Sequence, residues 1–523
     1  MSSSSNGRNA IALAAICVAA LMFGLEISSV PIALPVIEKR LHASFQDLQW
    51  IMNAYTIACT TVLMATGTLA DRFGRKRIFT ITIIAFGGAS LMCGLATDTL
   101  ALIVSRFVQG MAGGAMFICS IAVLSHQFPE GAERGRAFAI WGVVAGIGLG
   151  FGPIIGGEIV TWLTWPWVFL IHVPIALLTA GLTYAGVRES RDPEAKKLDL
   201  AGTVTLTVGI FALTYYITQG ADLGFLSPTG LEIAAIAFVG FAAFLAVERS
   251  VSHPMFDFSV FRIRNFSGAI IGCIGMNFSY WPFMIFLPIY FSAGLGYDST
   301  TTGLALLAYT IPFLAMPPVA QYLLARWGAR AVIPLGLFMI GLGFLLMRLG
   351  SGLDTASGSI VLAGALIAGM GLGLTTTPAT NMTTGSVSAD RAGMASGLDT
   401  SARLITLAVN IAAMGAILVA GILAHLHHAG LSNALPLRAV AEKIAAGNVM
   451  SLSQDPSVAA QVPASLAHAA LVHGIGWVML YGGIGVWILA AASFVTFGSA
   501  KARASRTTLP HPEEHRAAMR LEG

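Results

Sequence analysis

The sequence predicts an all-α integral membrane protein whose fourteen spanning helices form two related six-helix bundles with two helices inserted between them. Three observations predict this fold class. The 523 residues are 56% hydrophobic and only 10% charged, and their mean hydropathy is +0.78. Long apolar runs recur along the chain, and a basic loop pattern occurs twice. In soluble domains about a quarter of the residues are charged. The charged residues of this chain are too few to cover the surface of a soluble protein, so the composition excludes that class.

Apolar runs of about 20 residues, the length that crosses a bilayer, define the predicted helices in order. The first six are Ala10–Leu34, Leu48–Ala70, Ile78–Ala96, Leu100–Leu124, Ala137–Val160 and Trp167–Val187. The inserted pair is Leu200–Thr218 and Ile233–Val247. The last six are Phe266–Ala293, Leu304–Leu324, Val332–Leu349, Ile360–Asn381, Met394–Leu423 and Leu471–Phe497. The predicted divisions are an N-terminal bundle (1–187), a linker with the inserted spans (188–265), a C-terminal bundle (266–497) and a cytoplasmic tail (498–523).

The distribution of lysine and arginine predicts the orientation. An even number of spans places both termini on one side of the membrane. If that side is the cytoplasm, most basic residues fall in inner connections, and the outer connections hold only Lys39, Arg40, Arg348, Arg438 and Lys443. Because cytoplasmic loops carry an excess of positive charge, we expect a multi-pass protein of a bacterial inner membrane with both termini in the cytoplasm.

Two connections share a sequence pattern. Residues Gly67–Arg77 join spans two and three, and residues Gln321–Arg330 join spans ten and eleven. Arg72 aligns with Arg326, whereas Ala325 takes the place of Asp71. Internal repeats of this kind are found in many secondary transporters, so the two halves are predicted to share architecture but not chemistry.

Two charged residues lie well inside apolar runs, Glu26 in span one and Arg106 in span four. A charge at such depth costs at least about 2.5–3.5 kcal/mol and needs a partner or a water-filled cavity. Both residues lie roughly 9–12 Å below the outer ends of their spans at 1.5 Å per residue, so they could meet if the helix rotations allow it. A carboxylate there binds protons more or less tightly as its solvation and pairing change, so protons and a cationic substrate would compete. The alternative is a static ion pair between two helices.

Three motifs resemble those of the major facilitator superfamily. The loop residues Gly67, Asp71, Arg72, Gly74, Arg75 and Lys76 resemble the signature after its second span, and Leu102–Gly113, around Arg106, resembles its fourth-span motif. Residues Gly148, Gly152, Pro153, Gly156 and Gly157 fit G-x-x-x-G-P-x-x-G-G, a pattern typical of its antiporters. The resemblance implies a cytoplasmic gate, a proton-transfer arginine and a bendable interface helix. A basic loop that only sets topology and simple glycine packing are the alternatives.

Further matches narrow the resemblance to the fourteen-span drug:proton antiporter family. They are Trp50, Tyr55, the segment Trp165–Pro174 and the segment Gly393–Leu398. The chain departs from that family at Glu26, usually an aspartate, at Pro166, usually an arginine, and at His172, usually an asparagine. The resemblance covers essentially the whole chain and implies the major facilitator fold and proton-coupled export of small amphiphilic or lipophilic compounds, including cations.

The superfamily layout also implies a central substrate cavity faced by spans one, four, nine and twelve. The predicted cavity residues are Glu26, Asn277, Tyr280, Trp281 and Asn381, with Asn53, Tyr55 and His172 as second choices. Aromatic faces and a buried acid suit amphiphilic organic cations. For each aromatic residue the alternative is packing or anchoring at the membrane interface.

Other functional classes have less support. The sequence contains no G-x-x-x-x-G-K-[ST] nucleotide loop, so no cofactor is expected and the proton gradient is the expected energy source. No convergent catalytic set predicts an enzyme, and His425, His427 and His428 predict a surface cluster, not a metal site. The expected partners are a small-molecule substrate and the lipid bilayer, with no nucleic acid, and the protein is expected to act as a monomer. An exporter of one metabolite or siderophore and a non-transporting receptor remain as alternatives.

Overall fold

The computed structural model describes residues 2–128, 132–191, 199–251, 258–351, 358–387, 392–431, 436–448, 452 and 461–497. These residues form helices joined by short connections, and none of them forms a strand. The predicted all-α class is therefore confirmed. Most predicted spans lie inside longer helices, because polar residues at the ends of apolar runs continue the helical hydrogen bonding beyond the hydrocarbon layer.

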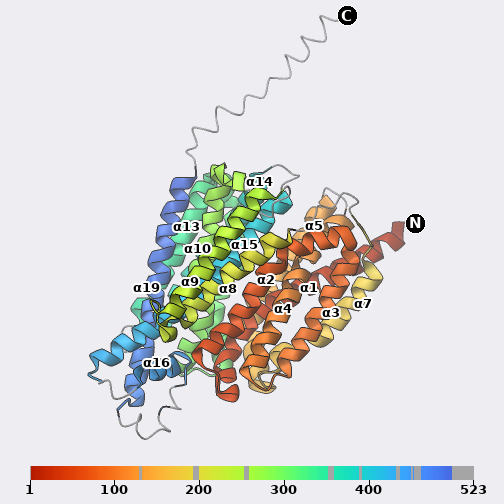
Figure 1. The fold of residues 1–523 in the computed structure, drawn as a ribbon. Helices are drawn as coiled ribbons and strands as arrows, with labels where there is room; N and C mark the ends of the chain where they lie inside the picture. The colour runs from red at the N-terminus through yellow and green to blue at the C-terminus, as the bar shows by residue number, and fades with distance from the viewer. Residues whose placement is uncertain are drawn as a thin grey trace, which may run out of the picture.

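The first group of helices lies at the N-terminal, red to yellow end of the chain in Figure 1. It comprises α1 (Ser2–Leu41), α2 (Phe45–Phe73), α3 (Arg75–Gly94), α4 (Thr99–Gln127), α5 (Ala132–Trp162), α6 (Trp167–Leu170) and α7 (His172–Gly186). Helix α1 packs on α5 and α7, α2 packs on α4, and α3 packs on α4 and α7. Ser44 and Asp47 form a reciprocal capping box at the start of α2, which fixes the sharp turn after α1.

The inserted pair follows as α8 (Leu200–Leu223) and α9 (Pro228–Ser250), which pack on each other. Ser227 caps α9 by accepting a hydrogen bond from the Gly230 backbone N–H. Helix α8 also packs on α2 and on α15 (Ala392–His428). It therefore covers one seam between the two bundles.

The remaining helices form the second group. They are the turn η1 (Phe258–Arg262), α10 (Arg264–Ile289) with its wider last turn η2 (Tyr290–Gly294), α11 (Ser299–Ala315), α12 (Pro317–Trp327), α13 (Ala329–Ser351), α14 (Gly358–Gly385), α15, α16 (Leu437–Ala445) and α19 (Ala464–Thr496). Helix α13 packs on α14 and α19, and α10 packs on α14, α15 and α19. Pro317 and Pro318 explain the 44° bend between α11 and α12, because proline removes a helical hydrogen bond.

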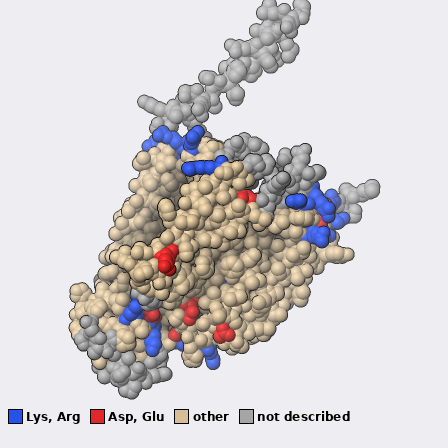
Figure 2. All heavy atoms as spheres, viewed as in Figure 1, with Lys and Arg blue, Asp and Glu red and all other residues tan. Residues whose placement is uncertain are grey.

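Twelve of the described helices are long and apolar enough to cross a bilayer, and the bent pair α11–α12 brings the number to thirteen. Helix α2 is not among them, although it connects α1 to α3 across the same bundle. The count of fourteen spans therefore stays a prediction. In Figure 2, Lys and Arg gather toward two ends of the molecule, and the broad surface between them is almost free of both. This is the surface expected of a protein surrounded by lipid.

The two groups meet along two seams, α5 against α11 and α2 against α15. Helix α1 begins and α19 ends on one side, the terminus side, and the groups lean apart toward it in Figure 1. Polar contacts join them toward the opposite, far side. Thr161 and Thr300 approach to 3.2 Å between their hydroxyl oxygens, and Asn448 donates a 2.6 Å hydrogen bond to the Glu38 carboxylate at the end of α1. These described contacts close the far side of the molecule.

Candidate functional site

The two deeply placed charges predicted from the sequence form a buried ion pair. Glu26 of α1 and Arg106 of α4 are both fully buried, and Arg106 Nη1 donates to Glu26 Oε1. The same nitrogen donates to Gln109 Oε1 at 2.7 Å, and Arg106 Nε donates to the Ile51 carbonyl oxygen at 3.0 Å. The guanidinium therefore ties α1, α2 and α4 together. The helix rotations, which the sequence did not reveal, bring the two charges into contact.

Glycines let the helices that carry this pair approach closely. A Cβ at Gly110 of α4 would collide with the Tyr55 backbone of α2, and one at Gly114 would lie 3.0 Å from the Cα of Cys59. The close approach places the Tyr55 ring under the Arg106 guanidinium, 4.3 Å from ring centroid to Cζ. A cation over an aromatic face is stabilised by the ring quadrupole, so the Tyr55 ring helps to position the guanidinium.

His172 at the start of α7 is a third member of the cluster. Its Nδ1 lies 3.4 Å from Glu26 Oε2, and its ring packs edge-on against Phe86. Among the described residues, Glu26 Oε2, Arg106 Nη2 and both ring nitrogens of His172 have no hydrogen-bond partner. Buried polar atoms without partners are costly, so this cluster holds charge in an incompletely satisfied arrangement.

A narrow central cavity lies beside the cluster, between the two bundles. Its volume is about 30 Å³, enough for about two water molecules. The residues that line it are Phe23, Ile27, Ser28, Pro31, Met52, Tyr55, Thr56, Arg106, Trp281, Met284, Ile285, Leu404, Leu407 and Ile411. Arg106 is the charged member of this mainly apolar lining, and Glu26 lies behind it. The guanidinium therefore connects the buried carboxylate to the space between the bundles.

The other predicted cavity residues are placed differently. Tyr55 and Trp281 line the cavity, but Tyr280 stacks on Tyr309 with ring centroids 3.9 Å apart and donates a 2.6 Å hydrogen bond to its carbonyl oxygen. Asn277 donates to the Cys273 carbonyl oxygen at 2.9 Å. Asn53 is fully buried in α2, and Asn381 is exposed on α14. These four residues do not line the central cavity.

The predicted gate motif forms the turn between α2 and α3. Gly74 has φ +110°, and a Cβ there would lie 2.7 Å from the Glu189 carboxylate. That carboxylate accepts the backbone N–H groups of Lys76 and Arg77 at 3.1 and 3.2 Å, as expected for an anion at a helix N-terminus. Gly67 belongs to the α2 backbone, Arg72 is exposed, and the Asp71 side chain lies outside the described part of the structure.

Two further basic contacts hold the gate motif to its own bundle. Lys76 Nζ donates to the Tyr184 carbonyl oxygen at 2.8 Å, and Arg75 Nη1 lies 3.2 Å from His126 Nδ1. Both partners lie in the last turns of α4 and α7. The described contacts of this loop therefore fasten the terminus-side ends of α2, α3, α4 and α7 to one another.

The predicted antiporter motif packs α5 against both bundles. A Cβ at Gly148 would lie 2.7 Å from the Leu21 carbonyl oxygen, one at Gly152 would collide with the Ser28 hydroxyl, and one at Gly156 would lie 2.8 Å from the Ser29 carbonyl oxygen. These three glycines, four residues apart, contact α1 on the turns around Glu26. Gly157 and Pro153 instead contact Ser299 and Gly303 of α11. The motif thus connects the helix that carries Glu26 to the second bundle.

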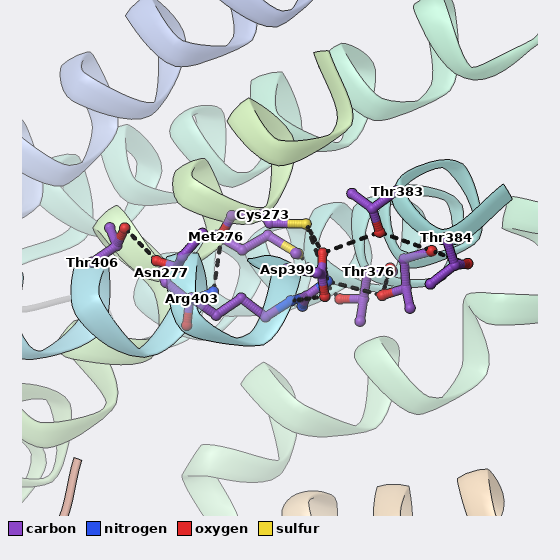
Figure 3. Close-up of polar contacts among 11 residues, drawn as sticks. Cys273, Met276, Asn277, Thr376, Thr383, Thr384, Asp399, Arg403 and Thr406 are labelled. Atoms are coloured by element: carbon purple, nitrogen blue, oxygen red, sulfur yellow. Dashed lines mark hydrogen bonds and ion pairs between the residues drawn. The ribbon is translucent and has the colours of Figure 1, made fainter. Parts of the chain in front are cut away.

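A second buried ion pair lies in the other bundle, at Asp399 and Arg403 of α15 (Figure 3). Arg403 Nε donates to Asp399 Oδ2 at 2.9 Å, and Arg403 Nη2 donates to Thr380 Oγ1 at 2.9 Å. Cys273 Sγ donates to Asp399 Oδ1 at 2.7 Å. Neither residue was among the predicted site residues. Their i, i+4 spacing is the signal that could have identified the pair.

The predicted histidine cluster lies at the far-side end of α15. The ring of His425 lies 5.1 Å from that of His473 of α19, measured between centroids. Within the described ranges, no group of three or more His, Cys, Asp or Glu side chains is arranged to hold a metal ion. The five cysteines are buried as free thiols.

Comparison with known proteins identifies the family of this chain. The model of the Major Facilitator Superfamily matches residues 16–409. The multidrug resistance protein Stp of Mycobacterium tuberculosis (strain CDC 1551 / Oshkosh) is 33% identical over 399 residues, which cover 76% of this chain and 74% of Stp. The puromycin resistance protein pur8 of Streptomyces alboniger is 31% identical over 81% of this chain and 84% of its own length.

Two further similarities extend over nearly the whole chain. The tetracenomycin C resistance and export protein of Streptomyces glaucescens is 28% identical over 94% of this chain and 92% of its own. A bacterial homologue of the human lysosomal transporter Spinster, solved in an inward-facing conformation, superimposes with a TM-score of 0.64 at 16% identity, covering 94% of this chain and 97% of its own. The chain therefore belongs to the Major Facilitator Superfamily and is a membrane transporter rather than an enzyme, with drug-resistance and drug-efflux proteins among its relatives.

Proposed function

We propose that this transporter is a proton-coupled antiporter that exports small amphiphilic or lipophilic compounds, including cations, by alternating access. The observation that carries the proposal is the fully buried Glu26–Arg106 pair, whose arginine is one of the residues that line the cavity between the bundles. The apolar lining supports the substrate class, because such walls bind lipophilic molecules and one charged group fixes their orientation. The efflux and resistance proteins among the relatives support the direction of transport.

Proton binding at Glu26 changes the charge of the cavity wall. With Glu26 ionised, the pair is neutral and the wall accepts a lipophilic cation. When Glu26 takes a proton from hydronium, a water molecule is released and the positive charge of Arg106 is no longer balanced. A cation beside that charge is then repelled. Proton and substrate therefore exclude each other, which is the requirement for antiport.

The energy source and the orientation follow from the same proposal. We infer that the termini lie in the cytoplasm of a bacterial cell with the protein in its inner membrane, because the basic connections are on the terminus side. The bundles at 1–187 and 266–497 would rock as two units, and one chain would be sufficient. Each elementary charge that moves through 100 mV supplies about 2.3 kcal/mol, or roughly fifty-fold accumulation, without a cofactor.

Transport by the purified protein in proteoliposomes with an imposed pH gradient tests the proposal. We expect wild type to accumulate a lipophilic quaternary ammonium compound against its gradient, and Glu26→Gln to equilibrate it only downhill. Asp399→Asn is the matched control, because it removes another buried carboxylate without touching Arg106. Accumulation by Glu26→Gln at the wild-type level would overturn the assignment of Glu26.

A second candidate is the dedicated export of one compound. The names of three relatives each specify a single antibiotic, namely puromycin, tetracenomycin C and methylenomycin A. The two candidates differ in competition assays with wild-type proteoliposomes. A broad exporter is inhibited by several unrelated lipophilic cations, whereas a dedicated carrier ignores all but close analogues of its substrate.

A further inference from the structure

A second, larger cavity lies on the far side of the molecule, between α2, α8, α15 and α16. It encloses about 330 Å³, against about 30 Å³ for the central cavity. Its walls include Phe45 and Gln49 of α2, Ile217 and Thr218 of α8, Gly415 and Leu423 of α15, and Arg438 and Glu442 of α16. This cavity exists because the inserted helix α8 and the short helix α16 cover the seam between the two bundles.

The two cavities are neighbours along the same pair of helices. Met52 of α2 and Ile411 of α15 line the central cavity, and Gln49 and Gly415, one helical turn further toward the far side, line the second. Between them, Gln49 Nε2 donates a 3.2 Å hydrogen bond to the Ile411 carbonyl oxygen. A Cβ at Gly415 would collide with the Gln49 amide, so the missing side chain makes room for this barrier.

The second cavity contains buried polar groups among apolar walls. Thr218 is 6% exposed, and its hydroxyl has no hydrogen-bond partner among the described residues. Thr214, one turn earlier on α8, is also fully buried without a partner. By contrast, Thr205 and Thr207 of the same helix donate to carbonyl oxygens four residues back at 2.8 and 2.7 Å. The hydroxyl of Thr218 makes no such bond, and its oxygen is shielded from the cavity in this conformation. A rotation of the side chain would present it to a ligand in the cavity.

A charged pair completes the wall. Arg438 Nε lies 3.0 Å from Glu442 Oε1 on α16. Phe45 and Phe225 are the aromatic members of the lining. Apolar and aromatic walls with a few placed polar groups are the composition that binds amphiphilic small molecules.

We propose that this cavity is the far-side binding site of the export path, which receives the amphiphilic compound from the central cavity when Gln49 releases Ile411. The inference rests on the proposed function and adds a second station to it. The apolar body of the compound packs against Phe45, Phe225 and Leu423. Its hydrogen-bonding or cationic group reaches Glu442 and, once the side chain rotates, the hydroxyl of Thr218. The inserted helix α8 is then a wall of the exit.

Photolabelling tests the occupancy of this site. The probe is a quaternary ammonium compound with an aryl azide, applied to the purified protein in phospholipid nanodiscs. We expect labelled peptides from α10 at the central cavity and from α8 around Thr218, both reduced by excess unlabelled compound. Thr218→Trp fills the second cavity and should lose the α8 label while keeping the α10 label. Val208→Trp is the control, because it adds the same bulk on the exposed face of α8.

The labelling result shows whether the second cavity binds the compound or a phospholipid. Absence of the α8 label in wild type, or a label that unlabelled compound does not reduce, would overturn the proposal. The second of these outcomes would assign the cavity to phospholipid.

Transport measurements separate this inference from the proposed function. In Thr218→Trp we expect at least tenfold slower gradient-driven export, while the proton release on adding compound to detergent-solubilised protein stays within twofold of wild type. Val208→Trp should match wild type in both. Wild-type export by Thr218→Trp, or loss of its proton release, would contradict a separate second site. If the wild-type protein itself released no protons when compound is added, the proposed function would instead be contradicted.

Discussion

The two buried ion pairs of this transporter are built on the same chemistry but differ in how completely their polar atoms are satisfied. The Asp399–Arg403 pair is formed within one helix and is surrounded by partners from two others, Cys273 and Thr380. Both oxygens of Asp399 accept hydrogen bonds. The side chain of Arg403 is 17% exposed and that of Asp399 6%. This pair ties α10, α14 and α15 together.

The Glu26–Arg106 pair joins two helices and is completely buried, yet Glu26 Oε2 and Arg106 Nη2 lack hydrogen-bond partners among the described residues. An ion pair in such surroundings gains less than its desolvation costs unless its remaining lone pairs and protons are satisfied. The polar atoms of this pair are therefore less completely satisfied than those of the Asp399–Arg403 pair. This difference is the reason that we propose Glu26, and not Asp399, as the proton-exchanging group.

The largest effect is expected from Arg106→Ala. Removing the guanidinium leaves Glu26 as a buried charge without its cation, which typically costs 3–5 kcal/mol, roughly, unless the group becomes neutral. We expect gradient-driven export at background level and a lower thermal transition in detergent. Arg106→Lys keeps the charge but cannot reach Glu26, Gln109 and the Ile51 carbonyl together, so it should restore stability more than export. If Arg106→Ala still exported compound with the pH gradient as driving force, the proposal that the Glu26–Arg106 pair, unlike Asp399–Arg403, couples protons to export would be contradicted.

A smaller effect is expected from Asp399→Asn. The substitution weakens the hydrogen bonds of Arg403, which retains its bond to Thr380. Hydrogen bonds to charged groups contribute about 1.5–3 kcal/mol, and the partial exposure of Arg403 reduces the loss. We expect a lower thermal transition with the proton coupling unchanged. Lost coupling at unchanged stability would make Asp399 the exchanging group.

The antiporter motif offers a matched pair of glycine substitutions. In Gly156→Ala the new Cβ would lie 2.8 Å from the Ser29 carbonyl oxygen, and in Gly157→Ala it would lie 2.7 Å from that of Ser299. The first displaces α1 near Glu26, and the second displaces α11 at the far-side seam. We expect both to slow export several-fold, but only Gly156→Ala to change compound-induced proton release. Equal effects of the two substitutions on proton release would show that the contacts of α5 with α1 and with α11 contribute equally to proton release.

The smallest effect is expected at the start of α11. Hydrogen bonds from the hydroxyl and backbone N–H of Thr301 hold the pKa of the Asp298 carboxyl below its usual range. Because this pKa is lowered in the folded protein, the stabilisation is present above the unfolded pKa and is lost as the pH falls through the folded one. Asp298→Ala should therefore lower the thermal transition slightly at pH 7 and not at all in strong acid. An equal shift at both pH values would show that the ionised cap contributes nothing.

The fold could be predicted from the sequence because it depends on hydropathy, which is a property of composition and run length. The sequence could predict that Glu26 and Arg106 lie at a similar depth in the membrane, but not that they touch. Their contact depends on helix rotation, which is set by packing between glycines and aromatic rings that are distant in sequence. The same reason explains Tyr280, whose hydroxyl bonds to Tyr309 on a neighbouring helix instead of lining the cavity.

Other parts of the site had weaker signals. His172 was predicted as a second-choice cavity residue, but its contact with Glu26 could not be predicted, because it depends on the path of α7. The helix α16 was missed because it lies in a polar outer connection without a long apolar run. The far-side cavity could not be predicted at all, since it forms where α2, α8 and the α15–α16 segment, which are far apart in sequence, pack together.

The most direct test of whether Glu26 exchanges a proton for the substrate is the proton release that a compound induces. The purified protein is mixed with a lipophilic quaternary ammonium compound in weakly buffered detergent solution containing a pH indicator, for wild type, Glu26→Gln and Asp399→Asn. Release of protons by wild type and Asp399→Asn, and none by Glu26→Gln, is the predicted result. Proton release by Glu26→Gln at the wild-type level would show that the exchanging group is not Glu26.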